Sequence, residues 1–350
     1  MADDLRSQNK SKNLPHSRDF VKRDLANLKN MKRILITGAL GQIGSELITF
    51  LRKRYGKENV IASDIKPIPE ETSNQGGIFE HIDCLDAQEI YSVINKYRID
   101  TIFHLAAVLS AAGEKNPQLA WKVNINGLYN VLEIAREYKC AVFSPSSIAA
   151  FGPSTPKDNT PQETIQRPTT IYGLTKVTGE LLCDYYYSKY EVDTRGVRFP
   201  GIISYATLPG GGTTDYAVEI FYEAIKNKKY TCFLDKDTYL DMMYMPDGLK
   251  AAVNLMEADP SQLKHRNAYN VTAESFNPEQ LAREIKKYIP DFEMNYDVDP
   301  MRQAIADSWP NRLDDTAARE DWGWSPDYDL KTMTKDMIEK LKIKLGTSGK

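Results

Sequence analysis

The sequence predicts an α/β protein in which a doubly wound parallel β-sheet is followed by a smaller C-terminal α/β lobe. Short apolar runs, the first at residues 34–37, alternate with amphipathic stretches of helical period as far as about residue 200. Such runs are typical of strands buried on both faces, and their alternation with helices specifies parallel pairing. After residue 201 the alternation becomes irregular, which indicates a separate lobe.

Composition narrows the class of protein. The chain has 350 residues, a hydrophobic content of 41% and a net charge of −3. It contains neither a basic stripe nor a run of about 20 apolar residues, so we expect no nucleic-acid partner and no membrane span. The four cysteines and four histidines are scattered, which predicts reduced thiols and no metal site. We predict a soluble intracellular protein of the cytoplasm or the mitochondrial matrix.

The expected division of the chain follows from its changes of composition. Residues 1–30 are polar and lack the apolar core of a secretory signal. They form an extension for which organelle targeting stays open. Residues 31–200 are expected to bind the cofactor and carry the catalytic groups. Residues 201–340 are expected mainly to bind substrate, and 341–350 form a basic tail.

Three glycines mark the first strand-to-helix turn. Gly38, Gly41 and Gly44 stand between the apolar run 34–37 and an amphipathic stretch that begins near residue 45. Glycines at this spacing permit a tight turn and a close approach of the backbone to a pyrophosphate, which the helix N-terminus then holds. The alternative is a bare turn. The position between a buried strand and a helix favours dinucleotide binding.

An acidic residue follows at the expected distance. Asp64 ends a second predicted strand, residues 60–64, where a carboxylate accepts hydrogen bonds from the adenosine ribose. The same charge repels a 2′-phosphate, so the sequence favours NAD over NADP, although Lys66 would soften that repulsion. A turn residue is the alternative for Asp64.

The next elements carry further candidate cofactor contacts. A third strand is predicted over 78–83, and its last residue, Asp83, either meets the adenine edge or caps the helix expected over 86–97. A fourth strand is predicted over 101–107, ending in small residues beside which a flat cofactor passes. His104 within it is expected to be a buried structural histidine. A long helix over 118–138 carries Asn124, and a fifth strand over 141–147 ends at Ser147.

The candidate catalytic pair is Tyr172 and Lys176. They stand four residues apart, so on a helix both side chains lie on one face. A neighbouring ammonium favours the phenolate and is expected to bring the tyrosine pKa down from about 10 toward working pH. The alternative, a solvated helix face, is weakened by the cofactor-binding features that precede the pair.

From about Lys32 to Trp324 the chain resembles the extended branch of the short-chain dehydrogenase/reductase family. This resemblance implies a Rossmann fold, NAD as cofactor, and catalysis by Tyr172, Lys176 and Ser147. The implied cofactor-binding set comprises Gly38, Gly41, Gln42, Ile43, Gly44, Asp64, Asp83, Cys84, Leu105, Ala106, Ala107, Asn124, Tyr172, Lys176, Pro200 and Ile202.

Four stretches, at 109–114, 200–204, 209–217 and 308–315, resemble the L-threonine 3-dehydrogenase branch of that family. The implied reaction is oxidation of L-threonine at its β-carbon to 2-amino-3-oxobutanoate. Tyr172 would act as the base, assisted by Lys176 and Ser147. The implied substrate-binding residues are Ser110, Ser147, Tyr172, Gly212, Thr213, Thr214, Asp215 and Trp309. Helix capping is the alternative for residues 213–215, and a core aromatic for Trp309.

The resemblance also implies partners. A homodimer joined through the helices around Asn124 and Tyr172 is expected, and a CoA-dependent 2-amino-3-ketobutyrate ligase would take the product. Two other functions stay open. One is a nucleotide-sugar epimerase or dehydratase of the same family, and the other is a non-catalytic NAD-binding regulator, which usually lacks the tyrosine or lysine that this chain keeps.

Overall fold

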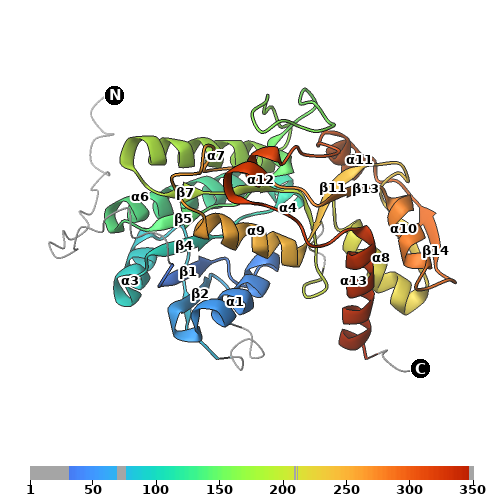
Figure 1. Ribbon diagram of the computed structural model, residues 1–350, viewed down its shortest axis with the longest axis horizontal. Coiled ribbons are helices and arrows are strands. Elements are labelled where there is room, and N and C mark those ends of the chain that lie inside the picture. Colours follow the sequence, from blue (N-terminus) through green and yellow to red (C-terminus); the bar gives the residue numbers. More distant parts are fainter. Residues whose placement is uncertain (1–30, 69–75, 209, 211, 347–350) are drawn as a thin grey trace, which may run out of the picture.

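The computed structural model describes residues 31–68, 76–208, 210 and 212–346. The expected extension 1–30 lies outside the described residues, as do Pro209, Gly211 and the last four residues of the expected tail. Figure 1 shows a first lobe built around a sheet and a C-terminal lobe beside it along the long axis. Within the described ranges, no helix has the length and apolar character needed to cross a membrane.

A six-stranded parallel sheet forms the first lobe. Its order is β3-β2-β1-β4-β5-β7, which confirms the doubly wound arrangement. The bounds are β1 (Ile34–Thr37), β2 (Val60–Asp64), β3 (Phe79–His81), β4 (Thr101–His104), β5 (Ala141–Phe143) and β7 (Thr194–Arg195).

Alternate residues of these strands fill two separate cores. Ile34 and Ile36 point to one face, where they join α1 (Gln42–Tyr55) and α9 (Met245–Glu257). Leu35 points to the other, toward α3 (Ala87–Tyr97), α6 (Leu128–Tyr138) and α7 (Ile171–Tyr190). Because both faces are covered, the strands are apolar throughout rather than alternating. Their carboxyl ends are left as the place where a ligand binds.

Three predicted strands end earlier than expected. β3 covers only residues 79–81 of the predicted 78–83, so Asp83 lies beyond its end. β4 stops at His104, and the chain then passes over the first glycine turn. β5 stops at Phe143, because Pro145 has no N–H to continue the ladder. Ser146 and Ser147 form a separate short strand, β6 (Ser146–Ser147), which pairs with β8 (Val197–Phe199) and through it with β12 (Tyr269–Asn270).

Two helical predictions also change. The helix expected over 118–138 consists of α5 (Pro117–Trp121), a π-helical turn η3 (Lys122–Gly127) and α6. Asn124 lies in the π turn, an irregularity that is frequent at functional sites. α3 is capped by Asp86, whose carboxylate accepts from the N–H groups of Gln88 and Glu89. The capping alternative for Asp83 was therefore wrong.

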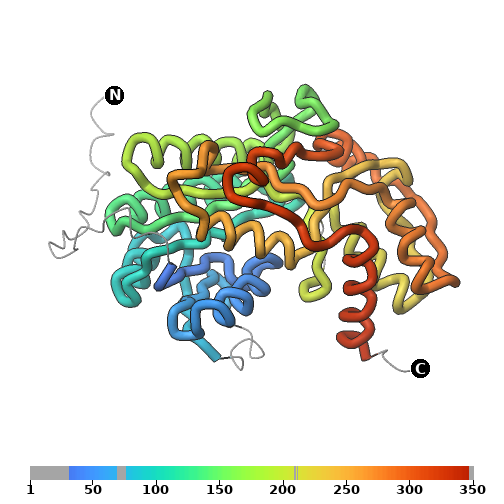
Figure 2. Tube along the Cα trace, in the orientation of Figure 1, coloured from blue at the N-terminus to red at the C-terminus, as the bar shows by residue number. Residues whose placement is uncertain are grey.

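The C-terminal lobe has its own core, centred on α8 (Tyr216–Asn227). Figure 2 shows the chain returning from this lobe over the first one. In this returning segment, α12 (Thr316–Trp322) packs near β12. The other strands are β9 (Gly201–Ile203), β10 (Lys229–Cys232), β11 (Leu240–Tyr244), β13 (Glu274–Phe276) and β14 (Glu293–Tyr296). The remaining helices and short turns are η2 (Lys57–Asn59), α4 (Ser110–Lys115), η4 (Ile148–Ala150), α10 (Pro278–Lys286), α11 (Pro300–Asp307), α12 (Thr316–Trp322) and α13 (Leu330–Lys344).

Candidate active site

The glycine turn after β1 leaves no room for a side chain at two of its three glycines, Gly38 and Gly44. Gly38 has φ +69°, and a Cβ there would lie 2.6 Å from the backbone nitrogen of Ala106. A Cβ on Gly44 would lie 2.4 Å from the carbonyl oxygen of Gly38. Gly41 is less confined, since its Cβ would come no closer than 3.3 Å to that same oxygen. Two of the glycines are thus needed for packing, and the third faces the space in front of α1.

The start of α1 fits a dinucleotide. Gly41 occupies the N-cap position, and no side chain caps the helix. The first N–H groups, including those of Gln42 and Ile43, are therefore left for an anion such as a pyrophosphate. Asp64 ends the neighbouring strand and is 8% exposed. Its carboxylate accepts from the backbone N–H of Leu40 at 3.0 Å and of Lys66 at 3.0 Å, which fixes it beside the turn.

The other candidate cofactor residues lie around the same edge of the sheet. The Asp83 carboxylate accepts from the N–H of Leu85 at 2.9 Å. Cys84 is buried, and a Cβ on Gly127 would lie 2.7 Å from its sulfur. Leu105, Ala106 and Ala107 follow β4 directly, and Pro200 and Ile202 lie at the β8–β9 junction.

Helix α7 presents the candidate catalytic pair, Tyr172 and Lys176. It begins at Ile171, because the Thr170 hydroxyl oxygen accepts from the N–H of Gly173 at 3.1 Å and caps the helix. The Tyr172 and Ser147 hydroxyls are hydrogen-bonded to each other. The Lys176 ammonium lies 5.4 Å from the centre of the Tyr172 ring and donates to the carbonyl oxygen of Pro145 at 2.6 Å. The structure therefore brings Ser147, Tyr172 and Lys176 together.

The tyrosine pKa differs from the sequence prediction. Burial raises the pKa of Tyr172 to about 12, and the hydrogen bond with Ser147 only partly opposes this. The expected lowering was wrong for the chain by itself, because desolvation of the phenolate is the largest effect on this pKa and only the Ser147 hydroxyl opposes it. Burial also lowers the pKa of Lys176 to about 8, against the opposing effect of Glu180.

Asn124 connects two parts of the site. Its side-chain oxygen accepts from the N–H of Val108 at 2.7 Å, and its amide donates to the Val108 carbonyl at 3.1 Å. The amide also donates to the Thr175 hydroxyl at 3.0 Å. Asn124 thus ties the segment after β4 to α7, through a side chain next to Lys176.

A small polar cavity of about 30 Å³ lies beneath the pair, with space for roughly two waters. His104, Asn124, Lys176 and Glu180 line it. The His104 Nδ1 is 2.8 Å from the Thr37 hydroxyl, and burial lowers the pKa of His104 to about 4. The histidine is 4% exposed, in agreement with the predicted buried position.

The candidate substrate residues fall into two groups. Thr213, Thr214 and Asp215 precede α8 directly, and the Asp215 carboxylate accepts from the N–H of Gly212 at 2.6 Å rather than from the first turn of the helix. Ser110 begins α4 and is buried. Trp309 is 6% exposed and belongs to the same core cluster as Tyr216, against which Tyr172 also packs. Trp309 is therefore a core aromatic, the alternative that the sequence left open.

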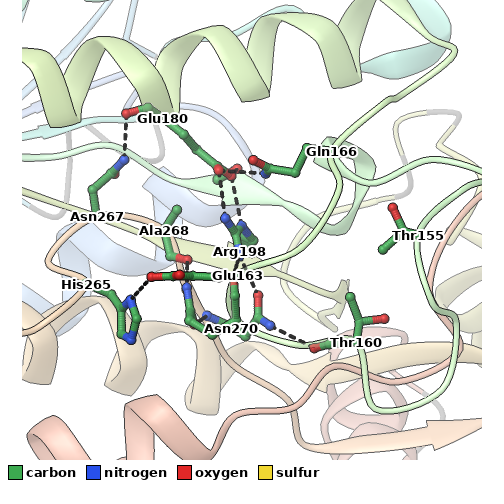
Figure 3. Close-up of polar contacts among 12 residues, drawn as sticks. Thr155, Thr160, Glu163, Gln166, Glu180, Arg198, His265, Asn267, Ala268 and Asn270 are labelled. Carbon is green, nitrogen blue, oxygen red and sulfur yellow. Dashed lines mark hydrogen bonds and ion pairs between the residues drawn. The ribbon is translucent and has the colours of Figure 1, made fainter.

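Sequence reasoning missed a buried polar group behind the candidate catalytic residues. Figure 3 shows the Glu180 carboxylate held by the Arg198 guanidinium, at 3.0 and 2.9 Å, and by the Gln166 amide, at 2.7 Å. Glu180 stands four residues after Lys176, so the helical period already placed it on the same face. Its partner Arg198 is distant in sequence and carried no signal.

Known proteins match nearly all of the described chain. A profile described as the NAD dependent epimerase/dehydratase family matches residues 34–272. An uncharacterised epimerase/dehydratase of Staphylococcus saprophyticus is 54% identical over 314 residues, which cover 90% of this chain and 98% of the relative.

Solved structures agree with this match. An L-threonine dehydrogenase from Clostridium difficile has a TM-score of 0.88 and 60% identity, with 90% of this chain and 98% of that one covered. An L-threonine dehydrogenase from Phytophthora infestans has a TM-score of 0.86 and 52% identity, with 89% and 100% covered.

Proposed function

This chain belongs to the NAD dependent epimerase/dehydratase family, and on that premise we propose that it oxidises L-threonine to 2-amino-3-oxobutanoate, a step of threonine catabolism. Its cofactor is NAD. The observation that carries the substrate assignment is the 60% and 52% identity to two L-threonine dehydrogenases over nine-tenths of the chain. The grouping of Ser147, Tyr172 and Lys176 beside the glycine turn supports the reaction type.

In this proposal the residues of the chain handle the proton and the orientation of the substrate. When bound, oxidised NAD supplies the hydride acceptor and a positive charge. Tyr172 takes the proton of the β-hydroxyl, and Ser147 hydrogen-bonds the same oxygen and fixes its direction. Lys176 places a positive charge beside the phenol and holds the ribose. In the chain by itself, with Lys176 in place, the pKa of Tyr172 is raised to about 12, so positive charge beyond that of the lysine would be needed to favour the phenolate.

Substrate selection is assigned to the segment before α8 and its neighbours. Backbone N–H groups at residues 212–214 and the N-terminus of α8 would receive the carboxylate of the amino acid. Ser110 and Thr213 are 8% and 4% exposed, so each offers a hydroxyl in a mostly desolvated place. Trp309 would shape the pocket through its packing. Asp215 is the proposed partner of the ammonium.

The exposed surface of helices α6 and α7 is the reason for proposing a homodimer. They expose large apolar side chains on one surface, among them Tyr129, Leu181 and Tyr185, which are 48%, 63% and 50% exposed. Burying such side chains is favourable, so we propose that a second copy covers them. The product would pass to a CoA-dependent 2-amino-3-ketobutyrate ligase.

An absorbance assay separates this proposal from a nucleotide-sugar epimerase, which returns its hydride. We expect L-threonine with NAD to produce NADH continuously, while D-threonine, L-serine and UDP-sugars produce little or none. NADH absorbance at equal enzyme concentration measures each substrate. Absence of NADH with L-threonine, together with conversion of a UDP-sugar, would reject the proposal.

A further inference from the structure

A buried ion pair lies directly behind the catalytic residues. Glu180 and Arg198 are 5% and 7% exposed, and the guanidinium binds both carboxylate oxygens (Figure 3). A pair of this kind gains little net stability over packed apolar residues, because two charges lose their hydration. A fully hydrogen-bonded buried network instead fixes geometry. The pair is therefore expected to fix the positions of the segments that it contacts.

Helix α7 is hydrogen-bonded to the segment that carries Ser147 at two successive residues, Pro145 and Ser146. Lys176 donates to the carbonyl oxygen of Pro145 at 2.6 Å. One turn later, Glu180 accepts a hydrogen bond from the hydroxyl of Ser146. The next residue is Ser147, which hydrogen-bonds Tyr172. One face of the helix thus carries the base, the lysine and the anchor of the strand that holds the serine.

Arg198 connects this hydrogen-bonded group to the surrounding loops. Its Nη1 donates to the Gln162 carbonyl at 2.7 Å and to the Asn270 side-chain oxygen at 3.0 Å. The Asn267 amide donates to the Glu180 backbone carbonyl at 2.9 Å. β8, which carries Arg198, also pairs with β6 in register, with Ser146 opposite Arg198. Three separate segments, through Ser146, Gln166 and Arg198, therefore contact the Glu180 carboxylate, and Arg198 and the Glu180 backbone connect it to further loops.

We propose that Glu180 and Arg198 are positioning residues, which lock Ser146 to helix α7 so that Ser147, Tyr172 and Lys176 meet the reacting oxygen together. The charges facing Lys176 are Glu180 and the Cys183 thiol on its own helix and His104 from β4. Of these, Glu180 has the larger effect in favour of the ammonium form, and Cys183 acts in the same direction. This inference rests on the proposed threonine oxidation, because kcat for L-threonine is one of the two quantities that test it.

The matched test compares Glu180→Gln with Asp193→Asn. Asp193 is also a buried carboxylate, 6% exposed, and it forms a bidentate pair with Arg195 at 2.9 and 2.8 Å. Arg195, however, donates to carbonyls at the end of α9, those of Leu255 and Ala258. Asp193 also accepts from Arg266, whose guanidinium lies 4.0 Å over the Tyr187 ring near the end of α7. Both substitutions remove one buried negative charge, but only Glu180 stands one turn from Lys176 and contacts the serine strand.

We expect Glu180→Gln to lower kcat for L-threonine by about tenfold or more with a small change in KM, because misplaced groups lose rate rather than binding. Asp193→Asn should lower the melting temperature and leave kcat at permissive temperature unchanged. Ser146→Ala, which removes one link and no charge, should also lower kcat. Combined with Glu180→Gln it should add little, since both break the same contact.

A second readout needs no substrate. NADH affinity, measured by fluorescence from pH 6.5 to 9.5, should show the titration of Lys176 near pH 8 in the wild type. Without the Glu180 charge the ammonium is less favoured, so the inflection should move to lower pH, whereas Asp193→Asn should leave it in place. Wild-type enzyme inactive on threonine would reject the proposed function alone. Equal kcat and pH inflection in the Glu180→Gln, Ser146→Ala and wild-type proteins would overturn the positioning role.

Discussion

Replacing Tyr172 by Phe should lower kcat for L-threonine by a factor of about 10²–10⁴ or more, as loss of a positioned acid–base group does. The substitution removes the oxygen that is hydrogen-bonded to Ser147 and leaves the ring in contact with the core of the C-terminal lobe. The fold and the cofactor turn should therefore persist. Steady-state NADH production measures the loss, and NADH fluorescence titration measures cofactor affinity, which should change little.

Tyr239→Phe is the matched control for this result. Tyr239 is 42% exposed. The substitution also removes one phenolic hydroxyl, but from a residue outside the candidate active site, so activity should equal that of the wild type. If Tyr172→Phe kept more than about a tenth of wild-type kcat, the phenol would not be the base. A protein that lost NADH binding as well would instead indicate a damaged fold.

Gly38→Ala should have the second large effect, on folding and on cofactor binding together. The new Cβ would lie 2.6 Å from the Ala106 nitrogen, in a residue with φ +69°. The left-handed backbone costs about 1–2 kcal/mol and the overpacking about 1–3 kcal/mol. These costs are a large part of the roughly 5–15 kcal/mol by which proteins are stable. Denaturant unfolding should show the loss, and NAD affinity should fall with it.

Gly41→Ala separates the two effects. A Cβ at Gly41 approaches only the Gly38 oxygen, at 3.3 Å, and the residue has φ −73°. Its stability should stay near that of the wild type, while NAD affinity falls because the methyl group enters the pyrophosphate space. Equal unfolding curves for Gly38→Ala and the wild type would contradict the packing role of the first glycine.

Local patterns predicted the parts of the site that depend on neighbouring residues. The strand, three glycines and helix at 34–55 are consecutive in the chain, and their chemistry defines the turn without reference to distant contacts. The same holds for Tyr172 and Lys176, whose spacing places them on one face of α7. These features, and the doubly wound parallel sheet, followed from hydrophobic period and turn chemistry.

Long-range packing decided what local patterns missed. The pKa of Tyr172 rises because folding buries the side chain, which packs against a core cluster built from distant segments, and no property of residues 171–176 specifies that burial. The partner of Glu180 comes from β8, and the serine strand leaves the main sheet to pair with it. Trp309 is buried by the core around α8. Each outcome depends on segments that meet only in the folded chain.

Transfer of deuterium from substrate to cofactor tests the central claim most directly. L-Threonine carrying deuterium at its β-carbon is incubated with enzyme and NAD, and the NADH formed is analysed by mass spectrometry. The account predicts one deuterium in each NADH, matched by an equal amount of 2-amino-3-oxobutanoate or the aminoacetone that it forms on decarboxylation. NADH without deuterium, or no net NADH while a nucleotide sugar is epimerised, would contradict it.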